Sequence, residues 1–196
     1  MAEVTRVRKR FLRPGEHFVT REPMMLSTLL GSCVAVCLFD PIARVIGMNH
    51  FLLPVRNPAS GHLALDSDAG RYGLWAMEIL INEALQLGAQ RKRLRAKAFG
   101  GANVLQLASL GLPERDGIGT ANVQFVRGFL EQDGVPLVAQ DLGGVNGRQV
   151  HFYGGDYSVF VRRIPRSNTT GIIEEERDYL RRTIAVEQRG RPADFF

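Results

Sequence analysis

The longest apolar run of the chain covers residues 26–39, where polar side chains are few. A nearly continuous apolar run predicts a strand that is buried on both faces, and we expect residues 33–39 to form it. Asp40 and Pro41 then indicate a turn. A second apolar run follows over residues 44–53. The two runs and the turn between them predict a β-hairpin.

Two later segments repeat their apolar residues with the period of an amphipathic helix. The first follows a polar loop at 55–70 and ends at Gly88, a residue suited to a helix C-terminus. The second covers residues 120–133, with Thr120 as the expected N-cap and Gly134 after its end. The remaining apolar segments predict strands near 94–99, 135–140, 148–153 and 157–163, and a last helix near 172–187.

Hairpins mixed with helices that follow strands indicate an α+β or layered α/β fold, with the fully apolar strand between two layers. The length of 196 residues suggests a single domain. We expect this domain to cover residues 1–164. Residues 165–196 are charged and rich in turn-forming residues, so we expect them to form a C-terminal tail.

The chain is basic, with a net charge of +5 and a pI of about 9.7. A basic balance favours nucleic acid, a membrane surface or an acidic protein as partner. The sequence carries no nucleic-acid-binding signature, so we do not expect nucleic acid as a partner. It also lacks a run of about 18 apolar residues and the apolar part of a signal peptide. We therefore expect a protein of the reducing cytoplasm that does not span a membrane.

The two cysteines, Cys33 and Cys37, are expected on one strand, four residues apart, where a disulfide between them is geometrically unfavourable. A single cysteine in an apolar run is usually an inert packing residue, and we expect this of Cys37. Cys33 differs because Gly31 and Ser32 precede it. Glycine lets a substrate approach the backbone closely, and consecutive backbone N–H groups can stabilise an oxyanion. Cys33 is therefore a candidate nucleophile.

The partner of this thiol follows from the expected hairpin. If the turn is centred on Pro41 and Ile42, Cys33 lies directly opposite His50 in the antiparallel pair. Opposed side chains point to the same face with Cβ atoms about 5 Å apart. An imidazole at that distance can take the thiol proton and stabilise the thiolate. A register slip of one residue would separate the two side chains.

A Cys–His pair usually needs a third group that orients the imidazole or the substrate. The hydroxyls of Ser27 and Thr28 are candidates. Ser27 is an even number of residues from Cys33, so the two would share a face on one regular strand. We therefore expect Ser27 to contribute more than Thr28.

The sequence gives less support to a metal site, a cofactor site or a second catalytic histidine. Cys33 and Cys37 could be half of a zinc site, but no second Cys or His pair completes it, so we expect no metal. No phosphate-binding loop or dinucleotide fingerprint is present, so we expect no cofactor. The glycine turns at 100–103 and 141–144 either shape a cleft or are only tight turns. The other histidines are expected to be structural or solvated; they are His17, His62 and His151.

Residues 30–40, followed by residues 47–54, resemble the signature of the CheD family, and so does the segment 96–103. Weaker matches are Ile118 and Gly119 with Asn122, the turn 141–144, and Gly147 with Arg148. The resemblance covers roughly residues 12–163.

This resemblance implies an enzyme that deamidates glutamine side chains of chemotaxis receptors. It implies two β layers with helices packed on one side, similar to bacterial toxin deamidases. It also implies Cys33 as nucleophile and His50 as general base. The family has a threonine six residues before the cysteine, where this chain has Ser27, with Thr28 beside it. The implied partners are the cytoplasmic part of chemoreceptors and a CheC-type phosphatase.

Two other hypotheses stay open. A non-catalytic adaptor that binds receptors or a signalling protein would need neither Cys33 nor His50, and release of ammonia from a receptor fragment would exclude it. A basic nucleic-acid-binding domain would bind DNA or RNA in a salt-dependent manner.

Overall fold

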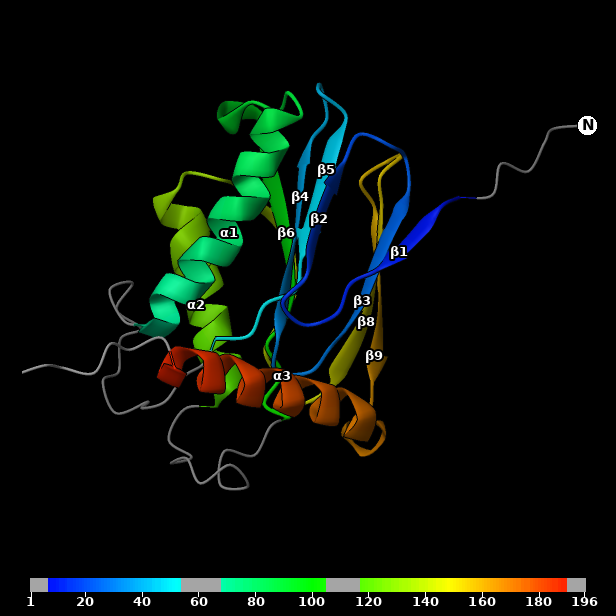
Figure 1. Ribbon diagram of the computed structural model, residues 1–196. Coiled ribbons are helices and arrows are strands. Elements are labelled where there is room, and N and C mark those ends of the chain that lie inside the picture. Colours follow the sequence, from blue (N-terminus) through cyan, green and yellow to red (C-terminus); the bar gives the residue numbers. More distant parts are fainter. Residues whose placement is uncertain (1–6, 54–67, 105–116, 190–196) are drawn as a thin grey trace, which may run out of the picture.

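The computed structural model describes residues 7–53, 68–104 and 117–189 and arranges them in layers (Figure 1). Two β-sheets pack face to face, and two helices cover the outer face of one of them. This architecture confirms the expected layered fold with two β layers and helices on one side. The likeness to bacterial toxin deamidases stays a prediction.

The strands belong to a four-stranded and a five-stranded sheet. The first has the order β1 (Lys9–Phe11), β3 (Met25–Leu30), β8 (Gly147–Tyr153) and β9 (Val159–Ile164). The second has the order β2 (His17–Thr20), β5 (Val45–Asn49), β4 (Val34–Asp40), β6 (Arg95–Gly100) and β7 (Leu137–Leu142). Short 3-10 helices lie at Arg91–Arg93 and Arg166–Asn168. The strands expected after residue 93 are confirmed within about two residues at each end.

Two amphipathic helices, α1 (Asp68–Gln86) and α2 (Ile118–Gln132), confirm the predicted helical segments and pack on the five-stranded sheet. Gly88 follows α1 with a φ of 95°, a conformation that favours glycine. The expected N-cap of α2 is corrected, because the helix starts two residues before Thr120 and its N-cap is Gly117. The Thr120 hydroxyl instead hydrogen-bonds the Asn103 side chain.

Strand β4 lies in the centre of the molecule and is buried on both faces, as its apolar sequence predicts. Val36 and Leu38 face the helices, whereas Ala35 and Cys37 face the other sheet. Because β4 separates two hydrophobic layers, it has no solvated face, and this explains the absence of polar alternation in its sequence.

The long apolar run of residues 26–39 is not one strand. It breaks after Leu30, so that β3 lies in one sheet and β4 in the other. Cys33 therefore lies on the connection between the sheets and not within a strand, which corrects the expectation from sequence. The apolar pattern did not reveal the break because β3 and β4 are both buried and equally apolar.

The predicted hairpin forms between β4 and β5, but with a longer turn. Residues 41–44 form the turn, and Asp40 pairs with Val45. The Asp40 carboxylate accepts hydrogen bonds from the N–H groups of Ile42 (2.9 Å) and Ala43 (3.1 Å), which stabilises this longer turn.

The longer turn changes the register. Cys37 pairs with Met48, whereas the expected register would pair it with Ile46. The pairing is shifted by two residues, so Cys33 does not lie directly opposite His50. A shift of two keeps every side chain on its expected face, so His50 still points into the layer between the sheets.

The expected tail contains a long helix, α3 (Thr170–Arg189), which lies across one end of both sheets (Figure 1). Leu180 of α3 is buried in the core between the sheets, and Ile172 is also buried. The expected boundary at residue 164 therefore does not mark the end of the core, although a helix near 172–187 was predicted. None of the helices in the described ranges is long and apolar enough to cross a membrane.

Candidate active site

The connection formed by residues 31–33 is held from outside by hydrogen bonds to all three of its carbonyl groups. The donors are the Ala102 N–H to Gly31 (2.8 Å), the Gly101 N–H to Cys33 (2.7 Å) and the Asn122 side-chain amide to Ser32 (2.8 Å). Since the carbonyls are fixed on one side, the three N–H groups of the loop converge on the other side. Consecutive N–H groups arranged in this way form an anion-binding concavity, or nest.

The glycine turn after β6 makes this geometry possible. Gly100 has a φ of 109°, and a Cβ on it would lie 2.2 Å from the Cys33 carbonyl oxygen. The second glycine turn supports the first, because the Gly143 N–H donates to the Gly100 carbonyl (2.8 Å). The turn at 100–103 is therefore more than a chain reversal: it fixes the loop that carries Cys33.

Replacing Gly100 with alanine is expected to lower the free energy of unfolding by more than about 1 kcal/mol, because the left-handed conformation and the contact with Cys33 both exclude a Cβ. Chemical denaturation measures this change. Gly128 is the matched control, since it lies exposed on α2 with open space around it. Gly128→Ala should leave stability unchanged or raise it by up to about 1 kcal/mol. Equal effects at the two positions would contradict the role given to Gly100.

The group that fills the nest is the carboxylate of Glu176 from α3. One oxygen accepts hydrogen bonds from the N–H groups of Gly31 (2.8 Å) and Cys33 (2.9 Å), and the other accepts one from Ser32 (2.8 Å). Glu176 is 1% exposed. Burial raises the pKa of this carboxyl, and the three N–H groups act in the opposite direction. A Cβ on Gly31 would lie 2.9 Å from the carboxylate, so glycine permits this close approach.

Cys33 is completely buried beside this carboxylate. Its Sγ, a ring nitrogen of His50 and a carboxylate oxygen of Glu176 lie within 4.8 Å of one another. Burial, and after it the negative charge of Glu176, raise the pKa of the Cys33 thiol well above its usual value. Both effects disfavour the thiolate while Glu176 lies beside Cys33.

The imidazole of His50 is oriented by Thr28. The Thr28 hydroxyl lies 2.7 Å from the Leu12 carbonyl oxygen, which can only accept, and 2.8 Å from His50 Nδ1. Because a hydroxyl has one proton to donate, Thr28 donates to Leu12 and accepts from Nδ1–H. The basic nitrogen is then Nε2, which is buried and has no hydrogen-bond partner among the described residues. The arrangement leaves a free proton acceptor near the thiol.

Ser27, the residue expected to have the third role, does not contact His50. It lies next to Thr28 on β3, so its side chain points to the other face of the sheet, where its hydroxyl is 3.5 Å from the Arg10 carbonyl oxygen. The structure therefore brings Cys33, His50 and Thr28 together. The expectation for Ser27 assumed one regular strand from Ser27 to Cys33, and the break after Leu30 removes that assumption.

The other candidates from sequence lie outside this group. Cys37 is buried in the core, which confirms its expected packing role, and burial raises the pKa of its thiol. His17 hydrogen-bonds Glu83 (3.0 Å), and His151 lies on β8. His62 lies outside the described residues.

The donors of Cys33, His50 and Glu176 are also of the kinds that zinc accepts. Both oxygens of the Glu176 carboxylate, however, already accept hydrogen bonds from backbone N–H groups. The three N–H groups therefore favour a bound anion, and they occupy the carboxylate oxygens that a metal ion would need.

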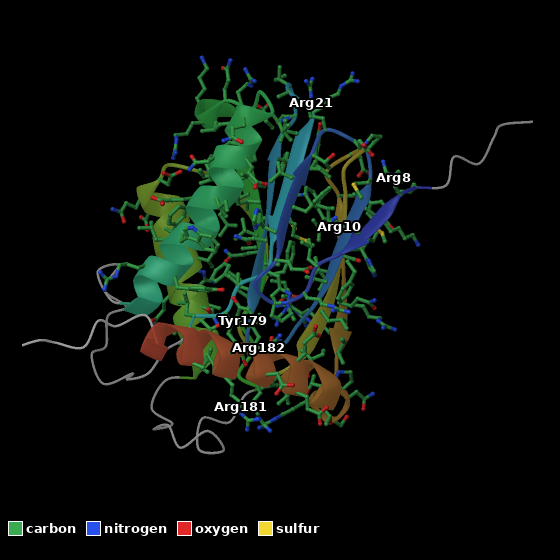
Figure 2. All side chains as sticks on the ribbon, viewed as in Figure 1. Arg8, Arg10, Arg21, Tyr179, Arg181 and Arg182 are labelled. Atoms are coloured by element: carbon green, nitrogen blue, oxygen red, sulfur yellow. The ribbon has the colours of Figure 1, made fainter. Side chains whose placement is uncertain are left out.

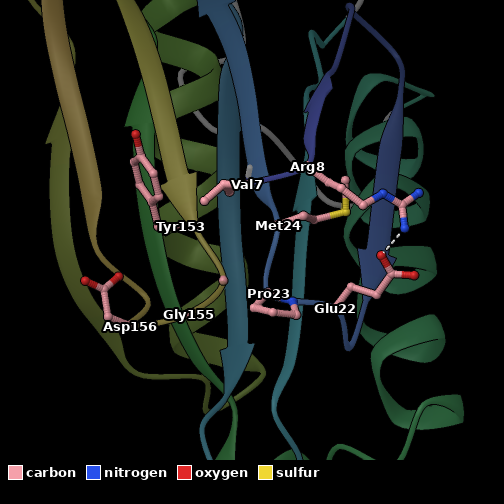
Figure 3. A pocket seen from close by; sticks show the side chains of 9 residues that line it. Val7, Arg8, Glu22, Pro23, Met24, Tyr153, Gly155 and Asp156 are labelled. Atoms are coloured by element: carbon pink, nitrogen blue, oxygen red, sulfur yellow. Dashed lines mark hydrogen bonds and ion pairs between the residues drawn. The ribbon is translucent and has the colours of Figure 1, made fainter. Parts of the chain in front are cut away.

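A cavity of about 620 Å³ lies elsewhere, at the turn between β8 and β9 (Figure 3). Met24, Pro23 and Tyr153 line it, and an ion pair between Arg8 and Glu22 lies at its side. It contains neither a cysteine nor a histidine, so it offers no nucleophile.

The residue that the sequence analysis missed is Glu176. A signal exists in the sequence, because Ile172, Glu176 and Leu180 are spaced by four and so follow one stripe of a helix. An acidic residue between two apolar positions of a buried stripe indicates a specific partner for its charge. The partner itself could not be predicted, since it lies more than 140 residues away.

Comparisons with known proteins agree with the sequence motifs. A family model described as CheD chemotactic sensory transduction matches residues 52–163, a range that begins just after His50. The chain is 54% identical over 147 residues to a Shewanella oneidensis protein named probable chemoreceptor glutamine deamidase CheD 2, covering 75% of this chain and 72% of that protein. A Geobacter sulfurreducens protein, probable chemoreceptor glutamine deamidase CheD 1, is 45% identical over 168 residues, covering 85% of this chain and 83% of that protein.

Among solved structures, the Bacillus licheniformis protein YfiH aligns with a TM-score of 0.38 and 16% identity, over 66% of this chain and 49% of that chain.

Proposed function

The chain belongs to the CheD family, and from this premise we propose that it hydrolyses specific glutamine side chains of chemoreceptors to glutamate. The observation that carries the proposal is the arrangement around Cys33. A thiol, the free Nε2 of an oriented imidazole and a nest of three N–H groups are the parts that acyl transfer through a thioester requires.

The proposed mechanism assigns one task to each part. Nε2 of His50 takes the proton of Cys33, and the thiolate attacks the amide carbon of the glutamine. N–H groups of the nest stabilise the oxyanion of the tetrahedral intermediate. The protonated imidazole then donates its proton to the leaving ammonia. Water hydrolyses the thioester, which restores the thiol and leaves glutamate.

We propose that Thr28 is the third group of the site and orients the imidazole of His50. Replacing Thr28 with valine keeps its shape but removes the acceptor of the Nδ1–H bond, so we expect turnover to fall by about 10- to 100-fold through loss of the correct imidazole tautomer. Ser27→Ala on the neighbouring position is the matched control and should change turnover by less than about threefold. The rate of deamidation measures both. A larger loss from Ser27→Ala would return the third role to Ser27.

Chemoreceptors are proposed as the substrates because the relatives at 45% to 54% identity are named chemoreceptor glutamine deamidases. We place the protein in the cytoplasm, where the signalling part of a chemoreceptor lies. A CheC-type phosphatase is proposed as a second partner on the ground of the family resemblance. Co-purification of the two proteins tests that proposal, and their separation at micromolar concentration would contradict it.

The test of the function is incubation of a purified cytoplasmic chemoreceptor fragment with this chain. Each reaction replaces an amide nitrogen with oxygen and releases one ammonia, so intact mass and ammonia must change together. Peptide mapping then identifies the glutamines. A receptor fragment that binds without a change of mass would support the alternative of a non-catalytic adaptor.

A further inference from the structure

Helix α3 is seated by apolar contacts on both sides of Glu176. Ile172 and Leu180, four residues before and after it, are buried. Tyr179 packs against Gly15, where an added Cβ would lie 2.5 Å from the ring. These contacts carry Glu176 into the nest beside Cys33.

The opposite side of α3 faces solvent. Arg181 and Arg182 are exposed on it (Figure 2). The helix is therefore amphipathic in the ordinary sense, apart from the one carboxylate in its buried stripe.

Helix α3 places the side chain of Glu176 in the nest. A glutamate side chain is what deamidation of a glutamine produces. A glutamine differs from it only in that an amide nitrogen replaces one oxygen, so its length and its carbonyl acceptor are the same. The backbone N–H of Cys33 donates a hydrogen bond to the Glu176 carboxylate (2.9 Å). The backbone N–H of the nucleophilic residue is a usual donor to the oxyanion in acyl transfer.

We propose that α3 occupies the seat of the substrate helix and holds Glu176 there as an intramolecular copy of the reaction product. The inference rests on the proposed function and deepens it. A substrate glutamine lies on a helix with apolar residues four positions before and after it, and that helix displaces α3. While α3 lies in this position, Glu176 blocks the nest and a substrate glutamine cannot bind there.

The contacts of Glu176 argue against a supporting role in catalysis. Glu176 does not orient the imidazole, because the partner of His50 Nδ1 is Thr28. Glu176 instead fills the N–H donors that the substrate needs. Its charge, and after it its hydrogen bond with the Cys33 side chain, also raise the pKa of the Cys33 thiol, which opposes formation of the thiolate.

The decisive variant is Glu176→Gln in the full chain, which converts the product copy into a substrate. The thiolate of Cys33 forms a bond to the amide carbon of the new side chain, the C–N bond breaks, and the nitrogen leaves as ammonia with the proton from His50. Water then hydrolyses the thioester and leaves glutamate. Peptide mapping by mass spectrometry should find glutamate at position 176, formed at a rate that does not depend on protein concentration.

Two controls accompany this measurement. Glutamine should persist in the double variant Cys33→Ser with Glu176→Gln, which lacks the thiol nucleophile, and in Glu174→Gln, whose side chain is exposed on the same helix. Persistence of the amide at position 176 while the wild-type chain deamidates a receptor fragment would overturn the inference and leave the function intact. Conversion whose rate rises with protein concentration would also overturn it. Failure of both reactions would instead reject the proposed function.

Alkylation of Cys33 tests independently whether Glu176 blocks the nest. Glu176→Ala removes the carboxylate, so labelling of Cys33 by iodoacetamide should become at least about tenfold faster, with Cys37 as an unreactive internal reference. Glu174→Ala should not change the rate. The same Glu176→Ala variant should deamidate a receptor fragment faster than the wild-type chain. An unchanged labelling rate, or a slower deamidation, would contradict the proposal that Glu176 competes with substrate.

Discussion

Replacing Cys33 with alanine is expected to slow deamidation of a chemoreceptor fragment by at least about 10³-fold, because loss of a covalent nucleophile leaves only binding and oxyanion stabilisation. The Thr28 hydroxyl cannot replace the thiol, because that hydroxyl is hydrogen-bonded to Leu12 and His50. Ammonia release under single-turnover conditions measures the loss.

Cys37 provides a matched control for this experiment. It is completely buried in the same hydrophobic layer, so Cys37→Ala removes the same atom from a similar environment. We expect Cys37→Ala to lower stability but to keep turnover within about threefold of the wild-type value. Circular dichroism and denaturation show that each variant folds. Wild-type turnover by a folded Cys33→Ala variant would exclude the thioester mechanism.

The layers of the fold could be predicted from sequence because they depend on local hydrophobic patterns. Helices α1 and α2 repeat their apolar residues at helical spacing, and β4 is apolar because both of its faces are covered. The turn between β4 and β5 was placed correctly, but its length was not. That length depends on the Asp40 side chain, which accepts two backbone hydrogen bonds within the turn.

Only part of the site could be predicted from sequence, because local patterns do not show which distant segments come into contact. Cys33 and His50 were found from residue type and spacing, and the even shift of the register left them in one layer. Thr28 was a candidate but was ranked below Ser27, and Glu176 was not found, because the positions of both depend on contacts between distant segments. The sheet crossing after Leu30 turns Thr28 toward His50, and α3 brings Glu176 to the loop from the far end of the chain.

These observations give a physical reason for the place of Cys33, the proposed nucleophile, on a connection and not on a strand. The N–H groups of a strand bond its neighbouring strands, whereas those of residues 31–33 all donate to one ligand, the Glu176 carboxylate, and their carbonyls are held by other segments. A loop fixed in this way combines available donors with little freedom to move. That is the condition for electrostatic stabilisation without reorganisation.

Replacing His50 with glutamine is expected to slow deamidation by about 10²- to 10⁴-fold, the usual contribution of general acid–base catalysis. Glutamine can still donate to the Thr28 hydroxyl, but it has no basic nitrogen to replace Nε2. His151→Gln is the matched control, since His151 lies on β8 and contacts neither Cys33 nor Thr28 through any described hydrogen bond. Its turnover should stay within about threefold of the wild-type value.

The His50→Gln variant also tests whether His50 is buried in its neutral form, through the pH dependence of the free energy of unfolding. Burial, partly opposed by the nearby Leu12 backbone carbonyl, lowers the pKa of His50 to about 4. An unfolded histidine has a pKa of about 6.5, so between these values the unfolded chain binds the extra proton, and stability falls as the pH falls. The contribution is complete above about pH 6.5 and is lost by about pH 4, an amount of about 3 kcal/mol. Carboxylates act equally in both proteins, so the difference in free energy of unfolding between wild type and His50→Gln should change by this amount between about pH 7 and pH 4. A difference that is independent of pH would mean that His50 has the same pKa in the folded and the unfolded protein, so that its imidazole is not held in the neutral form by burial.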